Sequence, residues 1–263
     1  MPRKIASRAS ALLQVALAIV LIVWGRASTA ADHPRHILFI GNSLTYVNNL
    51  PAATASLAPA DVTVDAFALP GASLVEDDHN PRVAELLAKG HYTDVVFQER
   101  GGNVVCIRAA CYEGADFKET ERASKALADR ARAGGAKVYY LGTWQANPRM
   151  DPLLVDGERR IASLMDARYI EIGQTWVSLR QSDPAGAWLH SDGQHPGYAT
   201  TALMAIRVWR AISGEPASRR PCVGGTLYYH APSEDGFFAV DRSAQPVTCL
   251  VDRLSAATLA KLP

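Results

Sequence analysis

The chain has 263 residues, of which 48% are hydrophobic and 20% charged, and its 27 basic and 26 acidic residues nearly balance. A charge so close to neutral gives no electrostatic reason to expect nucleic acid or an anionic membrane surface as a partner. The composition also excludes collagen-like, coiled-coil and disordered chains, so it predicts an ordinary globular protein.

The first thirty residues have the features of a secretory signal peptide. They contain four basic residues and no acidic one: Arg3, Lys4, Arg8 and Arg26. An apolar stretch of fourteen residues, 11–24, leads to small residues that end at Ala30, where we expect cleavage. The stretch is shorter than the roughly 20 residues of a spanning helix, so no stable membrane insertion is expected after cleavage. The remaining chain has 23 basic and 26 acidic residues, a formal charge of −3, and is expected to be secreted or periplasmic.

The cysteines agree with export, because their number is even and an oxidising compartment favours disulfides. There are four of them: Cys106, Cys111, Cys222 and Cys249. Of the three possible pairings we favour the local one, which joins the first cysteine to the second and the third to the fourth. The chain has no Cys-x-x-Cys motif, so a redox or zinc role is not expected.

Short apolar runs alternate with helical patterns along the chain. Five runs are predicted strands: 36–40, 62–69, 94–98, 137–141 and 169–172. The first, third and fourth are almost continuously apolar, as parallel strands covered on both faces are. Five segments are predicted helices: 52–58, 82–88, 117–133, 156–166 and 198–212. The alternation predicts a doubly wound α/β protein with a parallel central sheet.

We expect one domain over residues 31–214, followed by a C-terminal extension, residues 215–263, that packs on it. The extension starts in a segment bounded by Pro216 and Pro221 and holds the second cysteine pair. A few β-like residues, 226–229, and a short closing helix are its predicted elements.

Polar and glycine-rich segments follow the predicted strands and precede the last core helix. They are Gly41-Asn42-Ser43-Leu44-Thr45, Pro70-Gly71-Ala72-Ser73, Glu99-Arg100-Gly101-Gly102-Asn103 and Ser191-Asp192-Gly193-Gln194-His195-Pro196. Ligands of open parallel sheets bind at the carboxyl ends of the strands, so these segments are expected to meet at one edge. Together they supply a hydroxyl, backbone amides, a side-chain amide, an imidazole and a carboxylate, which are the groups that acyl transfer requires.

In these segments the chain resembles the SGNH (GDSL-type) hydrolases. The run ILFIGNSLT resembles the first block of that family, with Ser43 at the nucleophile position, and Gly71 fits the glycine of the second block. Residues 101–103 match the Gly-x-Asn of the third block, and residues 192–195 match the Asp-x-x-His of the fifth. The resemblance spans about residues 36–212. It implies a flavodoxin-like α/β/α fold and a serine esterase that needs no metal or other cofactor.

The sequence departs from the usual pattern of this family at one position. Asn42 replaces the usual Asp of Gly-Asp-Ser, which resembles a subgroup with Gly-Asn-Ser. That subgroup often has a Gln-Glu pair at the end of the third strand, as Gln98 and Glu99 are here. The side-chain amide of the oxyanion hole would therefore come from Asn103, which we prefer, or from Gln98.

The chemistry of these residue types supports a catalytic triad. A serine hydroxyl is a poor nucleophile until a base takes its proton, and an imidazole, with an ordinary pKa of ~6.5, suits that role. We expect Ser43 to attack, His195 to relay the proton, and Asp192 to orient the imidazole. The backbone amides of Ser43 and Gly71, with the Asn103 side chain, would hold the oxyanion.

Each assignment has a structural alternative. Ser43 would only cap the helix after the first strand, and the Asp192–His195 pair would only cap the helix from Tyr198. Gly71 would be the left-handed residue of an ordinary turn after Pro70, and Asn103 a turn residue.

Three further features have expected roles. Trp144, after the fourth strand, is expected to line the substrate pocket or to pack in the core. The run 76–79 (Glu-Asp-Asp-His) contains metal-ligand types but precedes a helix, where acids are favoured, so no metal site is expected. The loop that Cys106 and Cys111 close is expected to stiffen one wall of the pocket.

Taken together, the residues and the resemblance predict an exported serine esterase for short-chain or O-acetyl esters. Its substrate would be a small molecule or a glycan ester, and its oligomeric state is left open. The alternatives are an acyltransferase with the same triad, and a non-catalytic glycan-binding or envelope-assembly protein on a hydrolase fold.

Overall fold

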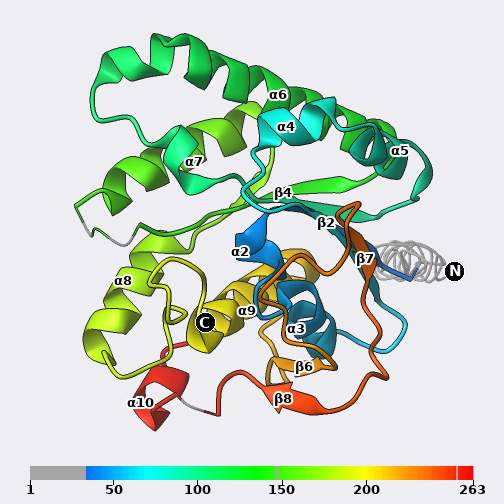
Figure 1. Cartoon of the computed structure of the whole chain (residues 1–263), viewed down its shortest axis with the longest axis vertical. Helices are drawn as coiled ribbons and strands as arrows, with labels where there is room; N and C mark the ends of the chain where they lie inside the picture. The colour runs from blue at the N-terminus through cyan, green and yellow to red at the C-terminus, as the bar shows by residue number, and fades with distance from the viewer. Residues whose placement is uncertain (1–33, 146, 148, 253, 263) are drawn as a thin grey trace, which may run out of the picture. The chain divides into compact units, whose positions relative to one another are not determined.

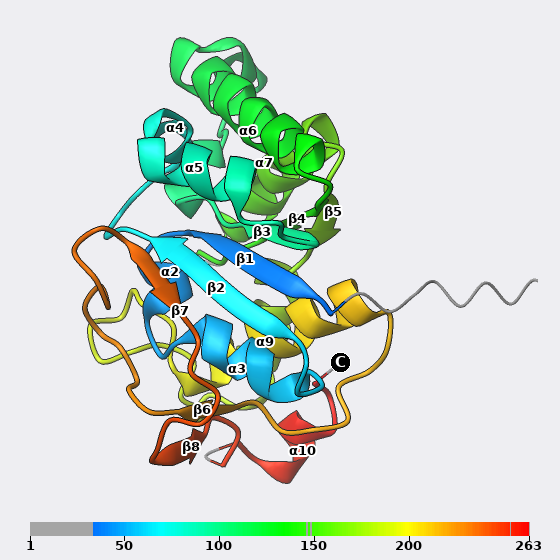
Figure 2. The ribbon, with the colours of Figure 1, turned by 90° about the vertical axis from the view of Figure 1, so that its right-hand side faces the viewer.

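The computed structural model describes residues 34–145, 147, 149–252 and 254–262. The predicted signal peptide and its cleavage site lie outside these residues. The main sheet has the strand order β5-β4-β3-β1-β2-β7 (Figures 1 and 2). Its strands are β1 His36–Gly41, β2 Thr63–Ala68, β3 Asp94–Phe97, β4 Lys137–Leu141, β5 Arg168–Ile170 and β7 Phe237–Ala239. The first five are parallel and follow the order 2-1-3-4-5, which confirms the predicted flavodoxin-like α/β fold.

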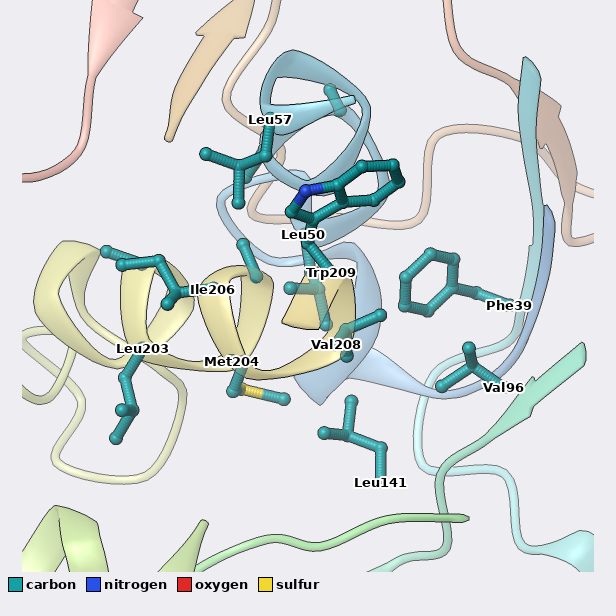
Figure 3. Close-up of a cluster of buried hydrophobic side chains, with 14 of the residues drawn as sticks. Phe39, Leu50, Leu57, Val96, Leu141, Leu203, Met204, Ile206, Val208 and Trp209 are labelled. Carbon is teal, nitrogen blue, oxygen red and sulfur yellow. The ribbon is translucent and has the colours of Figure 1, made fainter. Parts of the chain in front are cut away.

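Helices cover both faces of this sheet, as Figure 2 shows. On one face lie α2 Ser43–Tyr46, α3 Leu50–Leu57, α8 Gly173–Ser182 and α9 Tyr198–Ser213; on the other lie α4 Leu74–His79, α5 Pro81–Lys89, α6 Ala115–Ala133 and α7 Asp151–Leu164. Because side chains alternate along a strand, β1 serves both cores. Phe39 packs toward α9, with Val96 and Leu141 beside it (Figure 3), while Leu38 and Ile40 join the core under α6 and α7.

Strand register sets where the functional loops start. Ile40 of β1 lies opposite Phe67 of β2 and Phe97 of β3, and Phe97 lies opposite Tyr140 of β4. Four parallel strands therefore end nearly level, and the loops that follow them emerge side by side. The point between β1 and β3, where the chain order reverses, is where open α/β sheets bind ligands.

The C-terminal extension contributes to the sheet and also forms a small unit of its own. β7 pairs antiparallel with β2, whereas β6 Cys222–Gly224 and β8 Val247–Cys249 form a separate two-stranded sheet before α10 Ala256–Leu259. Disulfides join Cys106 to Cys111 and Cys222 to Cys249, which confirms the predicted pairing. Within the described part of the chain, no helix is long and apolar enough to cross a membrane.

The five predicted strands and the five predicted core helices are found with shifted ends, and the closing helix is α10, but the β-like run 226–229 forms no strand. Helix α7 starts at Asp151, five residues earlier than predicted, because Pro152 in its first turn needs no hydrogen-bond partner for its nitrogen. Among the α-helices and strands of the described residues, α2, α4, α8, β6, β7 and β8 were not predicted. Helix α4 does carry a sequence signal, the Ser73–Glu76 capping box, in which each side chain binds the other residue's backbone N–H.

Candidate active site

A cavity of about 590 Å³ lies at the carboxyl edge of the sheet, where the loops after β1, β2, β3 and β4 meet. The loop before α9 and the C-terminal extension complete its wall. Its lining includes Ser43, Gly71, Gly101, Trp144, His195 and Tyr229. The four segments singled out in the sequence therefore do converge, and a residue of the extension joins them.

Ser43 occupies the first position of α2, directly after β1. The cap of this helix is Asn42, whose Oδ1 accepts the Leu44 N–H at 3.1 Å, so the alternative in which Ser43 is the cap is wrong. The backbone N–H of Ser43 belongs to the first turn of a helix, where amides lack intrahelical partners and can bind an anion. The turn from strand to helix thus places Ser43 in the lining of the cavity.

Asn42 also explains why an amide replaces the usual carboxylate at this position. It is 2% exposed, and its Nδ2 donates to the Ala72 carbonyl at 2.9 Å while its Oδ1 caps α2. A carboxylate has no hydrogen to donate to a carbonyl and would be costly to bury there. The amide joins the turn of Ser43 to the loop that contains Gly71.

Gly71 is the third residue of a turn after β2. The Ala72 N–H donates to the Leu69 carbonyl at 3.3 Å, Pro70 is the second residue, and Gly71 has φ +68°, as a type II turn requires. A Cβ on this glycine would meet no atom within 4 Å, so conformation, not space, demands the glycine. The turn alternative is therefore correct as local structure, and the same turn lines the cavity beside Ser43.

Asp192 and His195 share a loop that precedes α9. The carboxylate Oδ1 accepts the N–H groups of Gln194 and His195 at 2.8 and 3.0 Å, and Gly193 between them takes φ +72°. His195 Nδ1 lies 2.7 Å from Asp192 Oδ2, and because an ionised carboxylate only accepts hydrogen bonds, the donor of this bond is Nδ1–H. The cap of α9 is Gly197, without a side-chain hydrogen bond, so the pair does not serve as a helix cap.

Hydrogen bonds keep Asp192 ionised. Burial by itself would raise its pKa, but the N–H groups of Gln194 and His195, the His195 ring and the Tyr229 hydroxyl outweigh burial and hold the pKa far below the ordinary value. An ionised carboxylate at the far nitrogen of an imidazole is the arrangement that stabilises an imidazolium. Ser43 and His195 line the same cavity, and within the described chain no direct hydrogen bond joins them.

The structure does not bring either predicted side-chain amide into the cavity lining. Asn103 donates from Nδ2 to Glu99 Oε1 at 3.1 Å. Gln98 is 1% exposed, and its Oε1 accepts the Asn42 N–H at 3.3 Å and the Thr45 hydroxyl at 2.9 Å. Gln98 thus holds the turn of Ser43 through hydrogen bonds inside the protein. The hydrogen bond to Glu99 keeps the Asn103 amide out of the cavity lining.

Trp144 lines the cavity, 7% exposed, and its ring stacks on Trp176 of α8 at 6.0 Å. Two buried carboxyl groups of α7, those of Glu158 and Asp151, hold its loop. Glu158 accepts the Thr143 N–H at 2.7 Å and the Thr143 hydroxyl at 2.9 Å, and Asp151 accepts the Gln145 N–H at 3.4 Å. Trp144 therefore lines the cavity and also packs in the core, so both expected roles apply to it.

Two residues that contact the Asp192–His195 loop were not singled out in the sequence. Asn48 is buried with φ +57°, and its Nδ2 donates to the Pro196 carbonyl at 2.7 Å, joining the end of α2 to the His195 loop. Tyr229 donates its hydroxyl to Asp192 Oδ2 at 2.9 Å. The Asn48-Asn49 pair does carry a sequence signal, because asparagine is the side chain that adopts the left-handed region most readily, whereas the contact of Tyr229 with a residue 37 positions away leaves none.

The remaining predicted features lie away from the cavity. Glu76 belongs to the capping box of α4 and Asp78 pairs with Arg122 and Arg130, so the 76–79 run has helix roles. Within the described part of the chain, no group of three or more His, Cys, Asp or Glu side chains is placed to hold a metal ion. The Cys106–Cys111 loop supplies none of the lining, since Cys106 packs in the core under α6, which corrects the expectation that this loop stiffens a pocket wall.

No protein-family model and no curated protein sequence matches the chain. Solved structures do match. A catalytic mutant of the acetylxylan esterase Axe2 from Geobacillus stearothermophilus is 14% identical with a TM-score of 0.54, covering 71% of this chain and 97% of that one. The lipase/acylhydrolase from Enterococcus faecalis is 15% identical with a TM-score of 0.50, covering 70% of this chain and 100% of that one.

A third match, the psychrotrophic esterase EstA from Pseudoalteromonas sp., is 15% identical with a TM-score of 0.50, covering 68% of this chain and 97% of that one. These likenesses confirm the SGNH-type fold that the motifs predicted. The chain also extends beyond the parts that these proteins match.

Proposed function

We propose that this protein is an exported serine esterase with the triad Ser43, His195 and Asp192. The observation that carries the proposal is that Ser43 and an Asp192-bound His195 line one cavity, with the Gly71 turn beside them. The two Axe2 structures support it, because they are catalytic mutants of that enzyme, one at an aspartate and one at a histidine three positions later. Asp192 and His195 have the same spacing.

The proposed reaction begins when His195 Nε2 takes the hydroxyl proton of Ser43 and Oγ attacks the ester carbonyl. The backbone amides of Ser43 and Gly71 stabilise the oxyanion, and His195 then gives its proton to the departing alcohol. Water releases the acyl group from Ser43 by the same route. The serine–imidazole hydrogen bond is expected to form when substrate closes the site, as such bonds often do. Asn103 would join the oxyanion hole only if its side-chain amide gave up the hydrogen bond to Glu99 and donated to the oxyanion instead.

The proposed substrate is an O-acetyl or other short-chain ester on a carbohydrate. Polar side chains, those of Arg100, Gln145 and Gln194, share the cavity lining with the rings of Trp144 and Tyr229. Hydrogen-bonding groups beside aromatic rings suit a sugar better than a long acyl chain. The two disulfides and the predicted leader support export to an oxidising compartment.

The test is hydrolysis of p-nitrophenyl esters graded by acyl length, with wild type, Ser43→Ala and Ser73→Ala. We expect Ser43→Ala to lose at least about 10³-fold in kcat, because the nucleophile is gone. Ser73→Ala is the matched control: it removes the cap of α4, costs about 1 kcal/mol of stability and keeps its kcat.

Activity confined to short acyl groups would support the proposed substrate class, and activity on long chains would favour a lipase. Full activity in Ser43→Ala would contradict the triad. A wild type inactive on every ester would favour the glycan-binding alternative, and acyl transfer to an added sugar would identify an acyltransferase.

A further inference from the structure

The C-terminal extension sends a loop, residues 226–230, to the proposed active site. The loop follows β6, which the Cys222–Cys249 disulfide joins to β8. Its backbone is attached to the turn between α2 and α3, since the Asn48 N–H donates to the Tyr228 carbonyl at 2.9 Å. The same turn is joined to the His195 loop through the Asn48 side chain. The extension is therefore fixed to both loops that carry the proposed nucleophile and base.

The next residue of this loop, Tyr229, contacts the Asp–His pair directly. Its hydroxyl donates to Asp192 Oδ2 at 2.9 Å, and its ring meets the His195 ring edge to face at 5.9 Å. The opposite neighbour is His190, whose ring stacks on Tyr229 at 4.4 Å. One tyrosine therefore contacts the carboxylate and both histidines of the loop.

The carboxylate oxygen that serves His195 has a second imidazole nearby. His190 Nδ1 lies 3.4 Å from Asp192 Oδ2, whereas His195 Nδ1 lies 2.7 Å from the same atom. Both imidazoles therefore lie within ion-pair distance of one carboxylate oxygen, and His195 is the nearer of the two. The Tyr229 hydroxyl donates to that same oxygen, and the Tyr229 ring stacks on His190, whose Nδ1 also lies 3.3 Å from the Ser191 hydroxyl.

We propose that Tyr229 is a positioning residue, which holds Asp192 in the orientation that serves His195 and keeps His190 from taking its place. This inference rests on the proposed function, because it assigns the extension a part in the same triad. The hydrogen bond to Asp192 raises the pKa of Tyr229, so the phenol stays protonated and remains a donor. The donated bond also helps to keep Asp192 ionised, as the imidazolium requires.

The kinetic test compares Tyr229→Phe with Tyr228→Phe on p-nitrophenyl acetate. Phenylalanine keeps the cavity wall and removes only the hydroxyl, so we expect kcat to fall about tenfold while KM changes less than about twofold. Tyr228 is the matched control: its ring packs edge to face on Phe238, and within the described chain its hydroxyl has no hydrogen-bond partner. Removal of the Tyr228 hydroxyl should therefore leave kcat unchanged.

A double variant tests the role of His190. If that histidine competes for Asp192 once the phenol is gone, the double variant Tyr229→Phe with His190→Ala should have a kcat about threefold higher than that of Tyr229→Phe alone. A double variant slower than Tyr229→Phe would overturn the competition between the histidines.

Proton NMR follows the hydrogen bond without any substrate. The downfield resonance of the proton between His195 Nδ1 and Asp192, assigned by its loss in His195→Ala, should move in Tyr229→Phe and stay in Tyr228→Phe. An unmoved resonance together with an unchanged kcat would overturn the inference and leave the esterase proposal intact. A moved resonance in a protein that hydrolyses no ester would support the positioning role while the proposed function fails.

Discussion

Each residue around Ser43 performs a definite local task. Asn42 caps α2 and binds the Gly71 loop, and Asp192 holds its own loop through two backbone N–H groups before it binds the imidazole. Ser43, Asp192 and His195 could be singled out because their short motifs resemble those of a known family, and the structure places Ser43 and His195 in the lining of one cavity. The direction in which a side chain points could not be predicted from the sequence. The Asn103 side chain points to Glu99 because the buried carboxyl group of Glu99 accepts a hydrogen bond from its amide.

Gly71→Ala tests the importance of the turn after β2. Alanine fits without a clash but is strained at φ +68°, so we expect a loss of about 1 kcal/mol in the free energy of unfolding. If the Gly71 amide binds the oxyanion, a shifted turn should also lower kcat by at least about tenfold. Urea unfolding and p-nitrophenyl acetate kinetics measure the two effects.

The matched control is Gly102→Ala, at a glycine without positive φ where a Cβ also meets nothing within 4 Å. It should change neither quantity. Equal kcat values for Gly71→Ala and Gly102→Ala would count against the Gly71 amide as an oxyanion donor.

At the scale of secondary-structure elements, helix α7 holds the cavity wall through buried acids. Glu158 is 1% exposed and binds Thr143 and Tyr169, which fixes the loop after β4. Apolar periodicity predicted the helix, but a glutamate inside a helical pattern normally indicates a solvent-facing side. Strands β1, β3 and β4 were predicted because their apolar runs are continuous, whereas β7 has three residues and depends on its pairing with β2.

The buried Glu158 should make stability depend on pH. Burial raises its pKa to about 8, against hydrogen bonds from Tyr169 and Thr143 that lower it. Because this pKa exceeds the ordinary value of 4.5, the folded protein keeps a proton that the unfolded chain releases. The resulting stability is fully present below pH 4.5 and is lost as the pH rises through about 8.

Glu158→Gln removes this titration, so its free energy of unfolding should fall less between about pH 5 and pH 8 than that of wild type, by about 2–4 kcal/mol. Glu99, whose pKa burial raises to about 7, leaves a remaining slope in both proteins. The exposed Glu119→Gln is the control and should follow wild type. Parallel curves for wild type and Glu158→Gln would show that Glu158 is ionised in the folded protein.

At the scale of the whole molecule, one sheet edge gathers residues from position 42 to position 230. The alternation of strands and helices predicted a parallel sheet, and because ligands bind at the carboxyl ends of such strands it also predicted that the four polar segments meet at one edge. The contribution of the extension was not predictable, because its loop has no regular sequence pattern. The position of this loop depends on the left-handed turn at Asn48 and on a pair of short strands joined by a disulfide.

The central claim is that this edge activates Ser43, and covalent labelling tests it most directly. Wild-type protein would be treated with a fluorophosphonate probe, and the modified peptide would be mapped by mass spectrometry, with His195→Ala as a second sample. We expect one adduct, on Ser43, formed at least about 10²-fold more slowly without His195. An adduct on another serine, or none on wild-type protein, would contradict the account.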